Sequence, residues 1–464
     1  MGVPRWVGLS VFMLLVCVAC AILPDTDVLI ERHAGQAARF ESAHGPLSVQ
    51  KNATILNVLK RKSGDIDILD KQIALEQAIV GSPFIVGNKV VLLQDGAQTY
   101  AAMFAAIRNA HDHINLETYI IEDDDIGRQF ADLLLEQQGR GIQVNVIYDS
   151  VGAMNTPIAF FERLKAGGIA VLEFNPINPL KAKTEWLLNN RDHRKLLVVD
   201  GQVAFIGGIN ISSVYSSALT LHRKAKAVAN VAENSRDWRD TDLQIEGPVV
   251  GELQKLFIDT WEKQRGPALP DRAYFPVLKT QGKDIVRAIG STPDDPYSLI
   301  YLTLIGAIGN AEKHIRLTNA YFVPDPQLLK SLIEEAERGV EVTLILPSYS
   351  DSGIVFHAGR ANYSALLKAG VKIYELHGAL LHSKTALIDG VWSCVGSTNL
   401  DWRSFLDNDE VNAVILWREF AQQMQAMFEQ DLASSEAIDL AAWESRSLLL
   451  RAKEWGASLW QRLL

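Results

Sequence analysis

The sequence predicts an α/β protein of two pseudo-symmetric lobes, each a mixed β-sheet flanked by helices, with one composite site between them. Two observations support this prediction. One segment of the chain occurs twice, at residues 193–210 and 382–399, with the same polar residues at the same spacing. The stretches before each copy also repeat, as alternating helix and strand patterns that are typical of βα units. A duplicated chain with one half-site per copy predicts a single site where the copies meet.

The two copies share a His, then a Lys two residues later, an Asp seven, a Gly fourteen and an Asn seventeen residues later. These residues are His193, Lys195, Asp200, Gly207 and Asn210 in the first copy, and His382, Lys384, Asp389, Gly396 and Asn399 in the second. Strand side chains alternate between faces, so each His and Lys shares one face. Asp followed by Gly is typical of a hairpin turn. Each copy therefore presents an imidazole, an ammonium and a carboxamide at one sheet edge.

The remainder of each lobe follows the same order. In the first lobe, residues 83–265, the pattern predicts helices at 101–110, 126–138 and 160–166 and strands at 114–121, 143–148 and 170–174. In the second lobe, residues 297–431, the stretches 307–317 and 338–342 repeat 106–116 and 140–144. Residues 266–296 are rich in Pro and Gly, which favours a connector between the lobes.

The N-terminus predicts membrane attachment. Residues 7–23 are almost entirely apolar, and Arg5 is the only charged residue before Asp25. Residues 1–24 are therefore either an uncleaved anchor or a lipoprotein signal that ends at a lipidated Cys20. A basic residue before the apolar segment favours a body on the exported side. Residues 25–82 are expected to be a mostly helical segment without catalytic groups.

The C-terminal residues 432–464 predict an amphipathic helical tail. Trp and Leu side chains alternate there with Arg and Lys. Such a helix suits a membrane interface, because Trp and Arg each place an apolar body in lipid and a polar end in water. A helix packed on the body explains the same pattern, and both interpretations stay open.

Composition narrows the function. The formal net charge is −10, which argues against non-specific binding to nucleic acid. Three cysteines are too few for a disulfide framework. The His, Asp and Glu residues show no metal-ligand spacing, so neither a metal nor another cofactor is predicted.

The doubled pattern of His, Lys, Asp, Gly and Asn resembles the signature of the phospholipase D superfamily. Three further stretches resemble the bacterial cardiolipin synthases within it, namely residues 148–152, 321–325 and 399–404. The resemblance covers residues 85–464. It implies a bacterial membrane enzyme, a phosphatidyltransferase that makes cardiolipin from phosphatidylglycerol through a phosphatidyl-histidine intermediate. Anionic phospholipids and a membrane surface are then the expected partners, without nucleic acid, and the oligomeric state stays open.

The side chains suit that chemistry without a metal. An imidazole is both a nucleophile and a proton carrier near neutral pH. By resemblance, His193 attacks phosphorus and His382 protonates the departing alcohol. Lys195 and Lys384 hold the phosphate as point charges, while Asn210 and Asn399 donate amide hydrogen bonds to it.

Supporting residues are also expected. The resemblance places Glu410 behind His382 as its orienting carboxylate, and Asp242 at the equivalent place in the first half. Asp200 and Asp389 are expected to serve the hairpin turns rather than the phosphate. Basic side chains near the motifs predict substrate contacts, with Arg191 and Arg194 as a basic rim and His357 and Arg360 as head-group ligands.

Three other functions compete with the phosphatidyltransferase. The first is a hydrolytic phospholipase D that uses water as its acceptor. The second is a nuclease or other phosphodiesterase with a soluble substrate, which the apolar N-terminus and the acidic net charge disfavour. The third is a non-catalytic lipid-binding module, which two intact copies of the motif disfavour.

Overall fold

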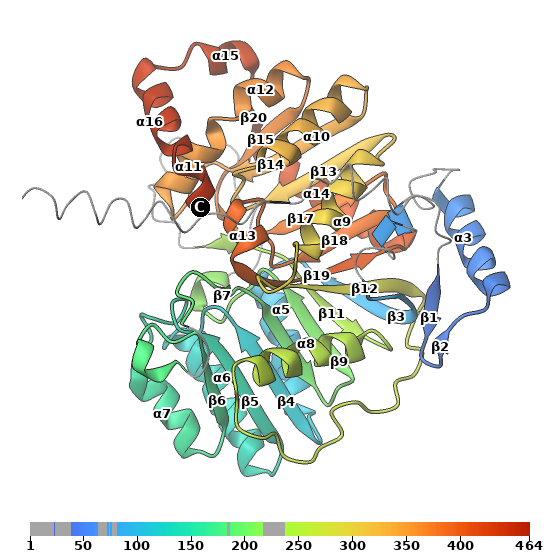
Figure 1. Ribbon diagram of the computed structural model, residues 1–464, viewed down its shortest axis with the longest axis vertical. Helices are drawn as coiled ribbons and strands as arrows, with labels where there is room; N and C mark the ends of the chain where they lie inside the picture. Colours follow the sequence, from blue (N-terminus) through green and yellow to red (C-terminus); the bar gives the residue numbers. More distant parts are fainter. Residues whose placement is uncertain are drawn as a thin grey trace, which may run out of the picture.

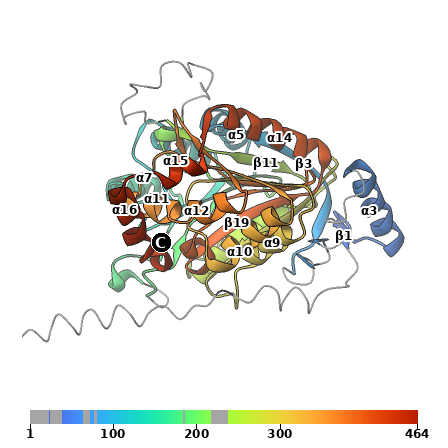
Figure 2. The ribbon, with the colours of Figure 1, turned by 90° about the horizontal axis from the view of Figure 1, so that it is seen from above.

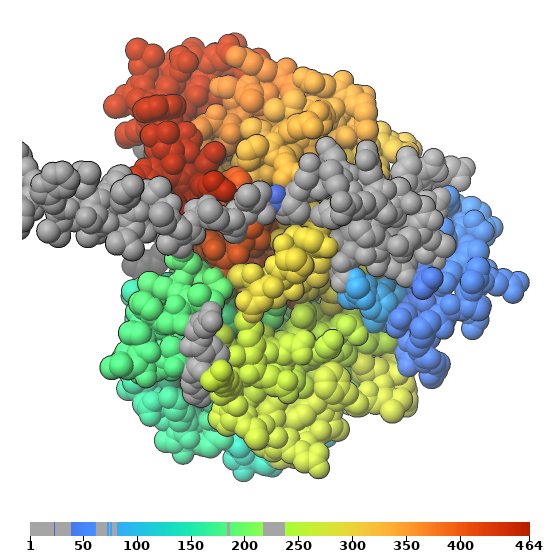
Figure 3. Space-filling view, viewed as in Figure 1, coloured from blue at the N-terminus to red at the C-terminus, as the bar shows by residue number. Residues whose placement is uncertain are grey.

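The computed structural model describes residues 23, 39–63, 72–73, 75–76, 81–182, 186–216 and 237–464. Two α/β lobes lie one above the other, the first drawn from light blue to lime and the second from yellow to red (Figure 1). The same division appears in the space-filling view (Figure 3). The predicted fold class, two similar α/β lobes with mixed sheets, is confirmed.

Among its described residues, the first lobe has seven strands in one sheet. Their order is β6 (Ala170–Phe174), β5 (Gln143–Asp149), β4 (His113–Thr118), β8 (Lys195–Val199), β9 (Val203–Gly207), β11 (Asp242–Glu246) and β3 (Phe84–Leu93). Strands β4 to β6 are parallel and the others antiparallel. The helices are α5 (Gly96–Arg108), α6 (Asp125–Gly139), α7 (Ile158–Ala166) and α8 (Val250–Lys263).

The second lobe repeats this order. Its strands run β15 (Lys372–Leu376), β14 (Glu341–Pro347), β13 (His314–Asn319), β17 (Lys384–Ile388), β18 (Trp392–Gly396), β19 (Asn408–Ile415) and β12 (Asp284–Ser291). Its helices are α9 (Leu299–Gly309), α10 (Pro326–Glu337), α11 (Gly353–Arg360), α12 (Tyr363–Lys368), α13 (Trp402–Leu406) and α14 (Arg418–Ala433). The internal repeat seen in the sequence is thus a repeat of strand order.

Strand β12 corrects the expectation for residues 266–296. The stretch was expected to be a connector, but its second half is a strand that pairs with β19 on one side and with β3 on the other. The sheets of the two lobes are therefore continuous through β3 and β12. Residues 25–82 also differ from the expected helical segment, because β1 (Phe40–Ser42) and β2 (Gly45–Pro46) precede helix α3 (Val49–Ser63).

The hairpin turns explain why an aspartate occurs at the same position, Asp200 and Asp389, in both copies of the repeat. Asp200 and Asp389 adopt left-handed backbone angles, with φ of 55° and 52°. Each carboxylate accepts three backbone N–H groups from the start of the neighbouring strand, at 2.8–3.0 Å, from residues 111–113 and 312–314 respectively. The two aspartates therefore lie at the turns, as expected, and fasten each hairpin to the adjacent strand.

A shared apolar core holds the lobes together. Helices α8 and α14, which follow equivalent strands, pack into one cluster with the central strands of both sheets. Buried members include Leu253 and Phe257 from α8, Phe420 and Met424 from α14, and Val286 from β12. Burial of each such side chain contributes roughly 1.5–3 kcal/mol, so separating the lobes would expose a large apolar surface. The interface between the lobes is thus a fixed part of the fold.

The C-terminal tail is only partly helical. Strand β20 (Ser435–Ala437) pairs with β15, and helices α15 (Leu440–Glu444) and α16 (Leu448–Ser458) and the short turn η5 (Gln461–Leu463) follow. Helix α16 lies beside α11 at the side of the second lobe (Figures 1 and 2). Within the described part of the chain, none of the helices is long and apolar enough to cross a membrane. The expected anchor at residues 1–24 lies almost wholly outside the described residues.

Candidate active site

Each motif histidine is fastened to the opposite lobe through its backbone. Strand β7 (Arg191–Asp192) pairs with β19, and the next residue, His193, donates its N–H to the carbonyl of Asp409 at 2.9 Å. In the same way β16 (Leu380–Leu381) pairs with β10 (Trp238–Arg239), and His382 donates to the carbonyl of Arg239 at 2.7 Å. Both imidazoles therefore stand at the junction of the lobes.

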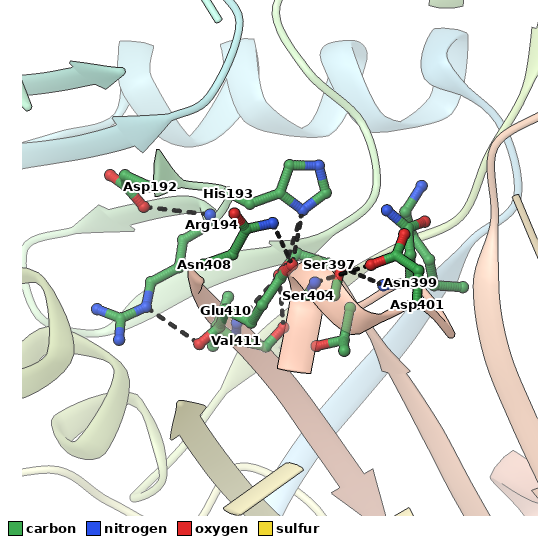
Figure 4. Close-up of polar contacts among 12 residues, drawn as sticks. Asp192, His193, Arg194, Ser397, Asn399, Asp401, Ser404, Asn408, Glu410 and Val411 are labelled. Carbon is green, nitrogen blue, oxygen red and sulfur yellow. Dashed lines mark hydrogen bonds and ion pairs between the residues drawn. The ribbon is translucent and has the colours of Figure 1, made fainter. Parts of the chain in front are cut away.

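The carboxylates that orient the two imidazoles are exchanged between the lobes. His193 Nδ1 lies 3.0 Å from Glu410 Oε1 (Figure 4), and His382 Nδ1 lies 2.6 Å from Asp240 Oδ2. The prediction that Glu410 serves His382 and Asp242 serves His193 was therefore wrong. Each histidine takes its carboxylate from the other half of the molecule.

Strand register explains why Asp240, and not Asp242, occupies the position in the first lobe that Glu410 occupies in the second. Gly207 lies opposite Asp242, whereas Gly396 lies opposite Asn412, so Asp242 corresponds to Asn412. A Cβ at either glycine would collide with the side chain opposite it. Asp242 accepts the N–H of Ile209 at 3.1 Å, and its buried second oxygen has no partner within the described residues. Asp242 thus supports the backbone between Gly207 and Asn210.

The two lysines lie beside the histidines of their own motifs. Lys195 Nζ donates to the carbonyl of His193 at 2.6 Å, and Lys384 Nζ lies 3.0 Å from His382 Nδ1. Burial lowers the pKa of Lys195 to about 7 and that of Lys384 to about 8, and Lys384 lowers the pKa of Lys195 further. Two ammonium groups that repel one another in a buried site are placed to receive an anion.

Electrostatic effects also cross the interface. After burial, the Lys384 ammonium contributes to lowering the pKa of His193, and the Lys195 ammonium contributes to lowering that of His382. Geometry links the two motifs as well, because the Tyr215 hydroxyl accepts a hydrogen bond from Asn210 Nδ2 at 3.0 Å and lies 3.5 Å from His382 Nδ1. The two half-sites therefore converge on one composite site, as the internal repeat predicted.

Burial and the Glu410 carboxylate have opposite effects on the protonation of His193. Burial lowers the pKa of His193 to about 4, despite the opposing effect of Glu410. Burial would raise the pKa of Glu410, but His193 and Lys195 outweigh it and hold that pKa below its usual value. Near neutral pH the ring is uncharged and donates Nδ1–H to an ionised Glu410. The Nε2 lone pair is then available as a nucleophile.

The two asparagines are held differently. Asn210 Oδ1 accepts the N–H of Ile120 at 3.1 Å, and its Nδ2 donates to the Tyr215 hydroxyl at 3.0 Å. Asn399 donates its backbone N–H to Ser404 Oγ at 3.3 Å, and its buried Oδ1 has no partner within the described residues. The second carboxamide is thus less constrained than the first.

Aromatic rings surround the imidazoles and were not predicted from the sequence. The Tyr119 ring stands 5.1 Å from that of His193. Trp238, Tyr215 and Tyr321 stand 4.9, 5.7 and 6.3 Å from His382. They exclude water from the site, which strengthens every polar interaction within it. Their positions outside the repeated motif gave no signal, although Tyr321 lies in a stretch that carried the family resemblance.

The expected basic rim at Arg191 and Arg194 is wrong, because both side chains are buried. Arg191 donates to Ser150 Oγ at 2.9 Å and to the carbonyl of Asn175 at 3.1 Å. Arg194 donates to the Glu410 carbonyl at 3.1 Å (Figure 4) and to Thr260 Oγ1 at 2.7 Å. Arg194 therefore supports the backbone of the carboxylate that orients His193.

The two expected head-group ligands lie with the C-terminal tail. Arg360 forms an ion pair with Glu375 at 2.9 Å, and its guanidinium lies 4.8 Å from the Trp443 ring centroid. Partial burial, followed by the charges of Lys453 and Arg360, lowers the pKa of His357. No contact of either residue reaches the four motif side chains His193, Lys195, His382 and Lys384 within the described structure. Their proposed contact with a head group gains no support from these contacts.

No candidate metal cluster accompanies the site. Among the described residues, no group of three or more His, Cys, Asp and Glu side chains is placed to hold a metal ion. The imidazoles, ammonium groups and carboxamides of the two motifs can supply a nucleophile, a proton carrier and positive charge. That set defines a class of protein that acts on phosphodiesters.

Comparison with known proteins identifies the family. The family described as "Cardiolipin synthase, PLD-like domain" matches residues 103–222 and 304–432. A cardiolipin synthase of Geobacillus kaustophilus is 34% identical over 82% of this chain and 74% of its own length. One from Alkalihalophilus pseudofirmus is 32% identical over 88% of this chain and 78% of its own. The chain belongs to the cardiolipin synthase family of proteins with phospholipase D-like domains.

A solved structure shares the fold. The phosphatidylserine synthase of Haemophilus influenzae superimposes with a TM-score of 0.61 at 14% identity, covering 85% of this chain and all of that one. At this identity the likeness concerns the fold alone. It shows that the arrangement of two similar lobes extends across the whole neighbouring chain.

Proposed function

We propose that the chain is a phosphatidyltransferase that condenses two molecules of phosphatidylglycerol into cardiolipin and glycerol. The observation that carries the proposal is the exchange of carboxylates, with Glu410 behind His193 and Asp240 behind His382. One carboxylate behind each imidazole fixes its tautomer and turns Nε2 toward the substrate. Relatives that are cardiolipin synthases, from Geobacillus kaustophilus and Alkalihalophilus pseudofirmus, support the choice of lipid substrate.

In the first half-reaction, His193 Nε2 attacks phosphorus and a P–N bond forms. The P–O bond to the glycerol head group breaks, and His382 gives its proton to the departing alkoxide. Lys195 and Lys384 neutralise the non-bridging oxygens, and the carboxamides of Asn210 and Asn399 donate hydrogen bonds to them. The bound phosphodiester anion also raises the pKa of both lysines and of His382, so that the proton donor becomes charged when substrate is present.

In the second half-reaction, His382 accepts a proton from a hydroxyl of the second phosphatidylglycerol. The hydroxyl oxygen attacks phosphorus, the P–N bond breaks and His193 is restored as neutral imidazole. Water is the competing acceptor and would give phosphatidic acid. The apolar rings of Tyr119, Trp238 and Tyr321 disfavour water at this step.

The test is product analysis with the purified full chain and phosphatidylglycerol labelled in its head group. We expect cardiolipin and free labelled glycerol in equal amounts, with phosphatidic acid as a minor product. A predominance of phosphatidic acid would establish the hydrolytic phospholipase D instead. Activity that EDTA abolishes and a divalent metal restores would contradict the mechanism.

The location in the cell is part of the same proposal. We infer attachment to a bacterial membrane through residues 1–24, with the body on the exported side. Arg5 before an apolar segment supports this orientation. Mass spectrometry of the mature protein would distinguish an intact N-terminus from a chain that begins at a lipidated Cys20.

A further inference from the structure

The C-terminal tail is folded with its polar side inward. In helix α16, Glu454 is 2% exposed, whereas Leu448 is 79% and Trp455 67% exposed. Arg446 donates to Glu454 at 2.7 and 2.9 Å, so the buried charge is paired. A helix that only packs on the body would place its apolar side inward. The tail therefore presents an apolar surface outward.

The first lobe carries a second exposed apolar patch. It lies in the loop between β6 and β7 and at the start of α7, where Leu180 is 93% and Ile158 72% exposed, and Trp186, Leu187 and Leu188 are also exposed. Trp186 Nε1 donates to the carbonyl of Pro176 at 3.1 Å, which fixes the loop on the lobe. Helices α7 and α16 lie on the same side of the molecule in two perpendicular views (Figures 1 and 2).

Both patches lead directly into the site. The loop that carries Leu187 and Leu188 continues into β7 and reaches His193 within a few residues. At the C-terminus of the tail, the carbonyl of Leu464 accepts a hydrogen bond from the N–H of Arg403 at 2.9 Å. Arg403 lies in helix α13, which begins shortly after Asn399. The exposed Ile354 at the start of α11 follows Asp351, which accepts the Tyr321 hydroxyl at 2.6 Å. Members of both patches are therefore joined, along the chain or by a hydrogen bond, to segments that carry site residues.

The charges on the tail favour an anionic surface. The exposed ionisable side chains of residues 447–464 are Arg451, Lys453 and Arg462, all basic, while the one acidic side chain is buried. Basic groups around an outward apolar helix are typical of contact with anionic lipid head groups. Exposed apolar area of this extent marks a binding surface rather than ordinary solvent-facing protein.

We propose that these two patches form one bilayer-docking face, made of Leu448, Leu449, Trp455, Leu459, Trp460 and Leu463 on the tail and Ile158, Leu180, Trp186, Leu187 and Leu188 on the first lobe. The face seats the body on a membrane of anionic phospholipid, so that the composite site opens at the head-group layer. This inference rests on the proposed function, because a lipid substrate must reach the site from a bilayer. It adds a second attachment to any N-terminal anchor, and it spans both lobes.

Two triple variants test the two halves of the face in the full chain. The tail variant is Leu449→Gln, Trp455→Gln and Leu459→Gln, and the loop variant is Leu180→Gln, Leu187→Gln and Leu188→Gln. We expect each to lower turnover of phosphatidylglycerol in vesicles by about tenfold, because apolar side chains leave the lipid. Turnover of a monomeric short-chain phosphatidylglycerol should stay within about twofold, since the site itself is unchanged. The matched control, Phe275→Gln with Val277→Gln, removes exposed apolar residues of the connector and should leave both rates unchanged.

Fluorescence gives a readout that is independent of catalysis. In vesicles of brominated phosphatidylglycerol, Trp455→Phe with Trp460→Phe should lower the quenching of the unchanged chain, and Trp186→Phe should lower it further. Quenching without any turnover would overturn the proposed function and leave the docking face in place. The docking face would be overturned if these Trp substitutions left the quenching unchanged. It would also be overturned if the tail and loop variants turned over vesicle phosphatidylglycerol as fast as the control variant does. A dimer that the tail variant dissociates, with vesicle turnover intact, would assign the face to a second copy instead.

Discussion

The two half-sites share their residues but not their surroundings. His193 donates to Glu410, which Ser397 also holds through its hydroxyl, and the resulting pair is a neutral imidazole with an ionised carboxylate. His382 contacts Asp240 and Lys384 at Nδ1 and lies among three aromatic rings. The first arrangement prepares a nucleophile, whereas the second suits a group that exchanges protons. Duplication therefore supplied two equal sets of residues, and their environments made them unequal.

The same comparison shows why neither half can act alone. Each histidine receives both its backbone partner and its carboxylate from the other lobe, so each lobe completes the opposite half-site. The shared core around α8 and α14 then fixes the distance between the two sets. The histidines and their carboxylates are thereby held within strands or directly beside strand ends, where the backbone is fixed by pairing.

The largest effects are expected at the histidines. His193→Ala and His382→Ala should each lower turnover by on the order of 10³-fold or more, and the double variant should be little worse, because residues that act as one unit are non-additive. Initial rates of cardiolipin formation would check this. Additive losses in the double variant would mean that the two histidines act independently.

Covalent labelling separates the two histidines. With an activated phosphodiester whose leaving group needs little protonation, His382→Ala should still form an acid-sensitive adduct on His193, and His193→Ala should form none. Mass spectrometry of peptides that contain either residue would locate the adduct. An adduct on His382 would exchange the two roles, and no adduct on either would contradict the covalent mechanism.

Substitution of the two exchanged carboxylates, Glu410 and Asp240, is expected to give the next largest loss of kcat after substitution of the histidines. Glu410→Gln and Asp240→Asn should each lower kcat by on the order of 10²-fold or more, since each leaves a misoriented imidazole. Asp242→Asn is the matched control. Burial, and then the charge of Asp240, raises the pKa of Asp242 well above its usual value, which favours the neutral carboxylic acid that Asn resembles in size and charge. Its substitution should change kcat less than about threefold, and a large loss there would restore Asp242 as the orienting carboxylate.

The dependence on pH follows from the buried groups. His193 must be neutral, so kcat/KM should fall as pH drops through about 4. The lysines must be charged to bind the phosphodiester, so kcat/KM should also fall as pH rises through about 7 to 8. Glu410 raises the pKa of both His193 and Lys195, and Glu410→Gln should therefore move both limbs to lower pH. A profile that is flat between pH 4 and 9 would contradict this assignment.

The sequence predicted what local chemistry determines. Within each repeated segment, the Asp at the turn, the Gly at the strand end and the alternation of His and Lys depend on neighbours a few residues away. The fold class followed from the same repeats. The six motif side chains lie in one composite site for this reason.

Long-range pairing explains the errors. The chain between Asn210 and Asp240 is much longer than that between Asn399 and Glu410, so spacing could not distinguish Asp240 from Asp242, and the family resemblance was read as pointing to Asp242. Nothing in either repeat shows that its carboxylate serves the other lobe. Arg191 and Arg194 looked like a basic rim because charge in a sequence does not reveal that buried acceptors surround it. Strand β12 was hidden because Gly and Pro on both sides made its stretch resemble a linker.

The smallest effect on rate is expected where the two lobes are alike. Asp200 and Asp389 each accept three backbone N–H groups and lie at the turns, away from the imidazoles. Asp200→Ala and Asp389→Ala should each lower the free energy of unfolding by on the order of 1–3 kcal/mol, because the strand ends lose a charged acceptor. Because the site is not touched, kcat at a temperature well below unfolding should change by less than about twofold.

Denaturant unfolding and initial rates would be measured on both variants, with Asp200→Asn and Asp389→Asn as controls that keep one acceptor oxygen. Equal losses of stability without loss of rate would show that the two hairpin turns are equivalent. The difference between the two half-sites would then arise from residues outside the turns. A loss of rate in one variant alone would mean that one hairpin, and not the other, transmits its position to the site.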